Sequence, residues 1–214
     1  QALLEMARKR DLRLWGAPTV VNSPQFAFMA GALAAGKLGR VSAAHACYGH
    51  TGPHWSAFFY EKGGGSLPDL GVYNLTTLTG LLGPAKAVTA MTSIVTKRRT
   101  VENKGDIAVE AEDNAMVVMD HGEGVLSHVM SGFNYFDPHG HDASGAERAT
   151  ISLFGTKGSM HLVGYDWGPK GVDLSTEGQP KPERQATDTK GYVWQEGATH
   201  VCECLVTGRK SLIT

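Results

Sequence analysis

Helical patterns come first along the chain. The opening sequence QALLEMARKRDLRLWGAP places leucine and alanine on one helical face and charged residues on the opposite face. A second helix is predicted from Ser23 to Leu38, because Ser23 is a good N-cap, Pro24 fits a first turn and GKLG ends the pattern. The apolar stretch at residues 12–21, between these two helices, predicts a short strand.

Strand patterns dominate the rest of the chain. Residues 40–50 and the β-branched residues 85–96 each predict one strand. Residues 114–133 and 149–164 each predict a β-hairpin, because apolar runs flank the turn sequences DHGEG and GTKG. The apolar content falls in residues 165–191, which predicts a loop or irregular edge structure.

The order of these elements indicates the fold class. A last helix is predicted at residues 197–208, with Gly208 just past its end. The chain has no internal repeats and no low-complexity tracts. Helices come first and mostly antiparallel strands follow, so an α+β layer fold is predicted.

Composition narrows the classes of function. The chain has 214 residues, of which 42% are hydrophobic and 19% charged, as in ordinary globular domains. A net charge of −1 does not indicate binding to nucleic acid or to an anionic membrane. No apolar run reaches the roughly 18 residues that a membrane-spanning helix needs. Three cysteines, Cys47, Cys202 and Cys204, fit a reducing compartment, so a cytoplasmic protein is predicted.

A polar pair follows a run of glycines in the sequence KGGGSLPDLGVYNLTTLTGLLG. In a helix over residues 67–82, the leucines would form one stripe, and Asp69 and Tyr73 would lie one turn apart on another. The helix dipole favours an anionic or polarised partner at this N-terminal end. Gly64 and Gly65 lack side chains, so they would let another backbone, a ligand or a cofactor ring come close.

Two interpretations of this pair stay open on spacing alone. In the first, Tyr73 transfers a proton with the help of a nearby cation, because a tyrosine has a reference pKa of about 10. In the second, the Tyr73 hydroxyl bonds to Asp69 or to backbone, and Asp69 caps the helix.

The segment GGGSLPDLGVYNLTTLTGLLGP resembles the GGxxxDxGxH/Y signature of the glucose–fructose oxidoreductase, inositol dehydrogenase and rhizopine-catabolism (Gfo/Idh/MocA) family. The segments LLEMARKRDLRLWGAP, AGALAAGKLGRVSAA, AEDNAMVVMDHGEGVLSHV and ISLFGTKGSMHL resemble other parts of that family in the same order. The resemblance covers nearly the whole chain, and the glycine-Asp-Tyr block is its most specific part.

The resemblance implies an NAD(P)-dependent oxidoreductase that acts on a sugar, a polyol or a related hydroxylated compound. It implies a predominantly antiparallel open sheet with helices on one face, and a homodimer or homotetramer formed through the other face. Asp69 matches the family's catalytic aspartate, and Tyr73 matches the position taken by histidine or tyrosine. The glycines Gly64 and Gly65 are predicted to approach the NAD or NADP cofactor. The alternative is a non-catalytic sugar-binding, regulatory or oligomerisation domain of the same fold.

The chain departs from the family pattern at the cofactor site. The fingerprint G-x-G-x-x-G and the family's Glu-Lys-Pro motif are both absent from the sequence. We therefore expect a fragment, in which residues 1–20 are the end of a Rossmann domain and residues 21–214 form the substrate-binding and oligomerisation domain. Such a fragment is expected to be inactive by itself.

Histidines and aromatic residues cluster just before the glycines. His50, His54 and Trp55 are candidates for lining a substrate pocket, although a solvated loop with one aromatic anchor fits the pattern equally well. In the sequence HVCEC, His200 and Cys204 have a spacing that suits a metal, but no complete ligand set is evident, so no metal site is predicted.

Two further groups of residues, a histidine pair and a basic run, give weaker indications of a functional site. His139 and His141 lie in a segment that is predicted to be a surface excursion. The basic run at residues 97–99 is predicted to be a solvated strand end rather than a contact for the 2′-phosphate of NADP.

Overall fold

A computed structural model describes residues 2–136, 147–185, 187 and 194–212 of the chain. Ten strands are described in these ranges: β1 (Val41–Gly49), β2 (Ala87–Ser93), β3 (Arg98–Val101), β4 (Gly105–Ala108), β5 (Asn114–Gly122), β6 (Val125–Gly132), β7 (Ala149–Gly155), β8 (Gly158–Tyr165), β9 (Gly168–Thr176) and β10 (Gln179–Gln185). The helices are α1 (Ala2–Lys9), α2 (Pro24–Ala34), α3 (Val72–Leu82) and α4 (Trp194–Thr207). A π-helical turn, Leu67–Gly71, runs directly into α3, and short 3₁₀ turns occur at Val20–Asn22 and Ala57–Phe59.

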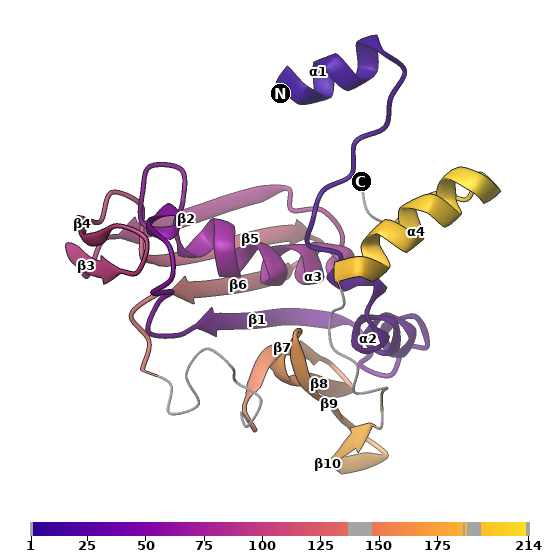
Figure 1. The fold of residues 1–214 in the computed structure, drawn as a ribbon. Coiled ribbons are helices and arrows are strands. Elements are labelled where there is room, and N and C mark those ends of the chain that lie inside the picture. Colours follow the sequence, from indigo (N-terminus) through magenta and orange to yellow (C-terminus); the bar gives the residue numbers. More distant parts are fainter. Residues whose placement is uncertain (1, 137–146, 186, 188–193, 213–214) are drawn as a thin grey trace.

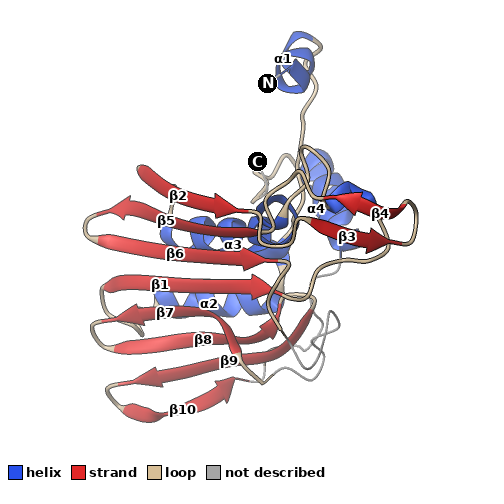
Figure 2. Ribbon diagram, turned by 90° about the vertical axis from the view of Figure 1, so that its left-hand side faces the viewer, coloured by secondary structure: helices blue, strands red, loops and turns tan. Residues whose placement is uncertain are grey.

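Eight of the strands form one open sheet in the order β10-β9-β8-β7-β1-β6-β5-β2. All neighbouring pairs in this sheet are antiparallel except β1 and β6, which run parallel. Helices α2 and α3 lie on one face of the sheet, and the other face is left open (Figures 1 and 2). The predicted α+β class and predominantly antiparallel open sheet are confirmed.

Successive side chains of a strand point to opposite faces of the sheet, and one of these faces is buried. In β5, Ala115, Val117 and Met119 are buried beneath the helices, while Met116 and Val118 point to the open face and stay about half exposed. The β5–β6 hairpin closes at DHGEG, and three consecutive residues of this turn, 122–124, have positive φ. Both hairpins expected from the sequence, at 114–133 and 149–164, are therefore confirmed.

Two local predictions were wrong and one hairpin was missed. Residues 12–21 form no strand, because Gly16 and Pro18 interrupt the apolar run and a proline cannot donate to a strand ladder. Residues 165–191, predicted to be a loop or irregular edge structure, contain the regular strands β9 and β10. Strand β10 (QPKPERQ) is an exposed edge strand, and edge strands are often rich in lysine and proline, which explains its low apolar content. The short β3–β4 hairpin lies outside the main sheet and was not predicted.

The helix that carries Asp69 and Tyr73 forms where the sequence predicts it. Its N-terminal turn is wider than an α-helical turn, since Leu67–Gly71 is π-helical. Helix α3 then packs on β1 and β6 through buried side chains that include Leu78. This packing fixes the start of α3 above the ends of the central strands (Figure 1).

Candidate active site

Tyr73 lies in a cluster of four aromatic rings. Its ring centroid is 6.4 Å from that of Tyr48 on β1 and 5.6 Å from that of Trp167, which follows β8. The Trp167 ring stacks on Tyr165 with centroids 4.5 Å apart and an interplanar angle of 10°. Tyr48 and Tyr165 are fully buried, whereas Tyr73 and Trp167 are partly exposed. Tyr73 and Trp167 therefore form the accessible rim of this aromatic cluster.

Asp69 precedes Tyr73 by one turn of the same helix. The side chain is half-buried, and desolvation raises the pKa of its carboxyl group to about 6. A carboxylate whose pKa lies close to neutral is suited to proton transfer or to hydrogen bonding with a hydroxyl group. A raised carboxyl pKa and a partly exposed phenol thus occur at the same end of one helix.

The half-buried carboxylate predicts that Asp69→Asn stabilises the protein near neutral pH. The folded-state pKa of about 6 exceeds the unfolded value of 3.8. Between these values the folded state binds more protons, so the free energy of unfolding falls as the pH rises from about 4 to about 6. The uncharged amide removes this loss. We expect the melting temperature of Asp69→Asn to exceed that of the wild type at about pH 7.5, and the difference to vanish below about pH 4.

The exposed carboxylate of Asp106 provides a control for this experiment. Asp106 pairs with Arg98 on the β3–β4 hairpin, and both side chains are more than half exposed. Asp106→Asn should not raise the melting temperature near neutral pH. If Asp69→Asn were less stable than the wild type at this pH, contacts of the carboxylate would outweigh its desolvation.

Glu112 binds the start of the Asp69–Tyr73 helix. The backbone N–H of Leu67 donates to Glu112 Oε1 at 2.7 Å, and the Ser66 hydroxyl donates to Glu112 Oε2 at 2.7 Å. An acidic group at this end of a helix satisfies a backbone donor and interacts favourably with the helix dipole. Glu112, which the sequence analysis did not single out, therefore fixes the position of the turn that presents Asp69.

The glycines before this helix lie against the chain itself. A Cβ atom on Gly65 would lie 2.5 Å from Glu112 Oε1, and Gly65 has a φ of +118°. A Cβ atom on Gly64 would collide with the carbonyl oxygens of Phe58 and Phe59. Close packing against the chain itself therefore explains why both positions are glycine. Their predicted contact with a cofactor stays a prediction.

The three predicted pocket residues occupy different environments. His50 is 1% exposed and accepts a hydrogen bond from the Gly52 N–H at its Nδ1 atom, at 3.0 Å. His54 is exposed, and its Nε2 atom lies 3.4 Å from Glu102 Oε1. Trp55 is 40% exposed and contacts the rings of His54 and Phe59 edge-on. His50 is thus a buried residue, while His54 and Trp55 belong to a surface loop; their predicted contact with substrate stays a prediction.

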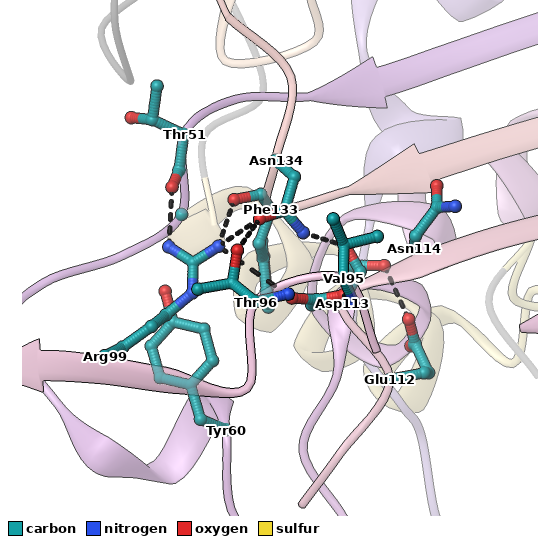
Figure 3. A network of polar contacts seen from close by, with 12 residues as sticks. Thr51, Tyr60, Val95, Thr96, Arg99, Glu112, Asp113, Asn114, Phe133 and Asn134 are labelled. Carbon is teal, nitrogen blue, oxygen red and sulfur yellow. Dashed lines mark hydrogen bonds and ion pairs between the residues drawn. The ribbon is translucent and has the colours of Figure 1, made fainter. Parts of the chain in front are cut away.

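The basic run at residues 97–99 is more than a solvated strand end. Arg99 is 15% exposed, and its guanidinium donates to the carbonyl oxygens of Thr51 and Phe133 (Figure 3). The Arg99 Nη2 atom also lies 4.0 Å from Asp113 Oδ2, and the Asp113 side chain is fully buried. The prediction of a solvated strand end was wrong for Arg99, because the folded chain brings three separate segments around its guanidinium.

A buried pair, Tyr48 and Asp166, was missed by the sequence analysis. Asp166 lies in the turn between β8 and β9, is 5% exposed, and accepts a hydrogen bond from the Tyr48 hydroxyl. Burial raises the pKa of Asp166 to about 7. The only local signal was the sequence YDW, two aromatic residues around an acid, in a segment that was interpreted as a loop.

Metal and membrane signals are weak in the described part of the chain. Among residues 2–136, 147–185, 187 and 194–212, no three or more His, Cys, Asp or Glu side chains gather to hold a metal ion. His200 Nε2 lies 3.5 Å from Cys204 Sγ and 3.1 Å from the Ser211 hydroxyl. His139 and His141 lie outside the described residues. Of the described helices, none is long and apolar enough to cross a membrane.

Comparisons with known proteins give information on the fold of the chain. A sequence profile described as the GFO/IDH/MocA C-terminal domain matches residues 26–161. A comparison with curated proteins finds no match. Among solved structures, aldose-aldose oxidoreductase from Caulobacter crescentus complexed with glycerol is 21% identical with a TM-score of 0.76, covering 99% of this chain and 59% of that protein.

Two further structures share the fold. An oxidoreductase from Agrobacterium radiobacter in complex with NAD⁺, L-tartaric acid and magnesium is 17% identical with a TM-score of 0.72, covering 98% of this chain and 60% of that protein. A 3-ketoreductase from Actinomadura kijaniata in complex with TDP-benzene and NADP is 15% identical with a TM-score of 0.66, covering 97% of this chain and 58% of that protein. The chain therefore spans about 60% of the length of these proteins.

Proposed function

The chain belongs to the GFO/IDH/MocA family of oxidoreductases, and from this premise we propose that it is the substrate-binding domain of an enzyme that oxidises or reduces a sugar, a polyol or a related hydroxylated compound. The observation that carries the proposal is the Asp69–Tyr73 pair at the start of one helix. A carboxyl group with a pKa of about 6 lies there one turn from a partly exposed phenol. The bound ligands of two structures that share the fold, L-tartaric acid and glycerol, are hydroxylated compounds, as such a substrate would be.

Each residue of the pair has a distinct proposed role. Tyr73 exchanges a proton with the substrate hydroxyl, and Asp69 accepts a hydrogen bond from the substrate and orients it. Lowering the pKa of a phenol from about 10 requires a cation next to it. The family's lysine supplies this charge in related enzymes, and its motif is absent from this sequence. We propose that the cation comes from polypeptide outside these 214 residues.

The cofactor of the proposed reaction is NAD or NADP. When bound, the nicotinamide ring accepts or donates the hydride. This chain contains no G-x-G-x-x-G fingerprint to hold the pyrophosphate. Its own contribution would be to place the substrate and its proton beside the nicotinamide, at the start of the helix, where Asp69 and Tyr73 lie. Residues 1–20 would then be the end of a nucleotide-binding domain, and residues 21–214 the substrate-binding domain.

A turnover assay tests the proposed function. The whole protein that contains this chain should be incubated with sugars and polyols and with each of the two nucleotides, and the nicotinamide absorbance followed. Hydride transfer with at least one hydroxylated substrate is expected. If the protein binds sugars but transfers no hydride with any of them, it is a binding or regulatory protein with the same fold.

We further propose that the open sheet face joins two copies of the chain. The large exposed apolar side chains of this face come from four strands, β2, β5, β6 and β7, and are Met91, Met116, Val118, Leu126 and Phe154. On β1, β5 and β6, the outward side chains include one formal charge, Asp120. This part of the face does not repel its own copy, because it carries so little charge, and apolar burial favours the pairing. This surface would support a homodimer or homotetramer.

Met116→Glu should dissociate the proposed oligomer. Met116 is 46% exposed on β5, between the exposed Met91 of β2 and the strand β6, and pairing would bury the new carboxylate against apolar side chains. We expect the variant to sediment as a monomer at concentrations where the wild type is a dimer or tetramer. Val206 on α4 is 87% exposed on the helix-covered side, so Val206→Glu is the matched control. A wild type that is monomeric at all concentrations would contradict the proposed interface.

A further inference from the structure

The turn between β8 and β9 is tied to the end of β1 by two tyrosines. The Tyr48 hydroxyl donates to Asp166 Oδ2 and accepts from the Asp166 backbone N–H at 3.1 Å. The Tyr165 hydroxyl donates to the carbonyl oxygen of Gly49 at 2.8 Å. Arg148 donates to the same Tyr165 hydroxyl and lies over the Tyr165 ring. The two residues directly before Trp167 in the chain are therefore held by specific hydrogen bonds.

Asp166 is an unusual group to bury at this place. It is 5% exposed, and among the described residues no lysine or arginine forms an ion pair with it. A buried carboxylate without a cation costs stability unless hydrogen bonds compensate for its lost hydration. Since Tyr48 is its side-chain hydrogen-bond partner, the pair holds this turn in one conformation. A turn needed only to connect two strands requires no such group.

This arrangement presents Trp167 beside Tyr73. Trp167 packs face-to-face on Tyr165 and edge-on against both Tyr48 and Tyr73. Of these four rings, only those of Tyr73 and Trp167 reach the surface. A molecule bound at the Tyr73 hydroxyl would consequently meet the indole ring of Trp167 next. Hydrophobic rings with a few polar groups beside them are the usual lining of small-molecule sites.

We propose that Trp167 is a specificity-determining residue, whose indole ring packs against the C–H face of a cyclic, uncharged sugar or polyol and so acts as an aromatic platform. Asp166 and Tyr48 are then the positioning residues of Trp167. The proposal rests on the function proposed above and names a further contact of the same site. A sugar ring offers apolar C–H groups on its face and hydroxyl groups at its edge. The indole ring binds the face, while Asp69 and Tyr73 bind hydroxyl groups at the edge.

Calorimetric titration of the whole protein with a panel of cyclic sugars and with glycerol, at saturating nucleotide, tests the platform. Trp167→Leu should weaken binding of the cyclic sugars by roughly tenfold, since an aromatic contact contributes about that much in affinity. Binding of glycerol, which has no ring face, should change little. Trp167→Phe retains an aromatic ring and should restore most of the lost affinity, which separates stacking from general packing.

Kinetic constants test the two positioning residues. Asp166→Asn and Tyr48→Phe each remove part of the tie that holds the turn, without removing a ring. Both should raise KM for cyclic sugars by several-fold, with a smaller effect on kcat, because Tyr73 and Asp69 stay in place. Loss of kcat alone, with KM unchanged, would overturn the positioning role. If Asp166→Asn fails to fold, Tyr48→Phe and the Trp167 variants still decide the proposal.

The outcomes distinguish this inference from the proposed function. Turnover with unchanged sugar affinity in Trp167→Leu would overturn the platform and leave the oxidoreductase standing. Sugar binding that depends on Trp167, without any turnover, would support the platform and refute the oxidoreductase. If the wild type binds none of the sugars, both proposals are wrong.

Discussion

Tyr73→Phe is expected to reduce the turnover of the whole protein by roughly a hundredfold to ten-thousandfold, the range that a positioned acid–base group contributes. The substitution removes one oxygen atom and keeps the ring. The packing of residue 73 against Tyr48 and Trp167 should therefore be retained, and with it the fold. Turnover should be measured with the best substrate of the sugar and polyol panel, together with the melting temperature and the oligomeric state.

A matched control removes a phenolic oxygen elsewhere. The Tyr60 hydroxyl donates to the Pro53 carbonyl oxygen at 2.6 Å, so Tyr60→Phe loses a buried hydrogen bond outside the aromatic cluster. That variant should lose about 1 kcal/mol of stability and keep most of its turnover. If Tyr73→Phe also keeps its turnover, the phenol is not the proton donor, and the chain's role reduces to binding or assembly.

Asp113→Ala is expected to lower the free energy of unfolding by about 3–5 kcal/mol, the usual effect of removing one partner of a buried ion pair. The Asp113 carboxylate accepts hydrogen bonds from the backbone N–H groups of Val95 and Thr96, at 2.7 and 3.0 Å. It also lies 4.0 Å from Arg99 (Figure 3). The substitution leaves two backbone N–H groups without this acceptor and takes away the carboxylate that faces the guanidinium. Urea denaturation of wild type and variant measures the difference.

An exposed ion pair supplies the comparison for this experiment. Asp106 and Arg98 face each other at 2.5 Å on the β3–β4 hairpin, with more than half of each side chain exposed. Asp106→Ala should lower the free energy of unfolding by at most about 1 kcal/mol, because solvent screens such pairs. Equal losses in the two variants would mean that the burial of Asp113 adds nothing to its contribution.

The elements that could be predicted from the sequence are those specified by local signals. The hairpin at 114–133 carries its own turn of glycines and polar residues, and the helix at 67–82 follows a glycine run and has a regular leucine stripe. The π-helical turn at Leu67–Gly71 has no such signal, since its geometry depends on packing around the helix start. Strand β10 was missed because its position at the sheet edge, rather than its apolar content, makes it a strand.

The candidate site was predictable only in part, for the same reason. Asp69 and Tyr73 are neighbours on one helix, so their spacing in the sequence already places them together. Tyr48 and Asp166 are separated by 118 positions, and only the pairing of the strands between them brings them into contact. A single sequence contains no local signal for such a contact. Arg99 was misinterpreted because a basic run near a strand end is usually hydrated.

Two histidines at the centre of the open sheet face, His45 and His128, contact each other and hold different tautomers. His45 Nδ1 and His128 Nδ1 lie 3.0 Å apart on the adjacent strands β1 and β6. The two rings are stacked, and their centroids are 5.1 Å apart. One nitrogen must carry the hydrogen atom while the other offers its lone pair, so the neutral rings hold opposite tautomers. Two protonated rings would direct N–H against N–H. The hydrogen bond between the two side chains therefore requires that at least one of the two rings is neutral.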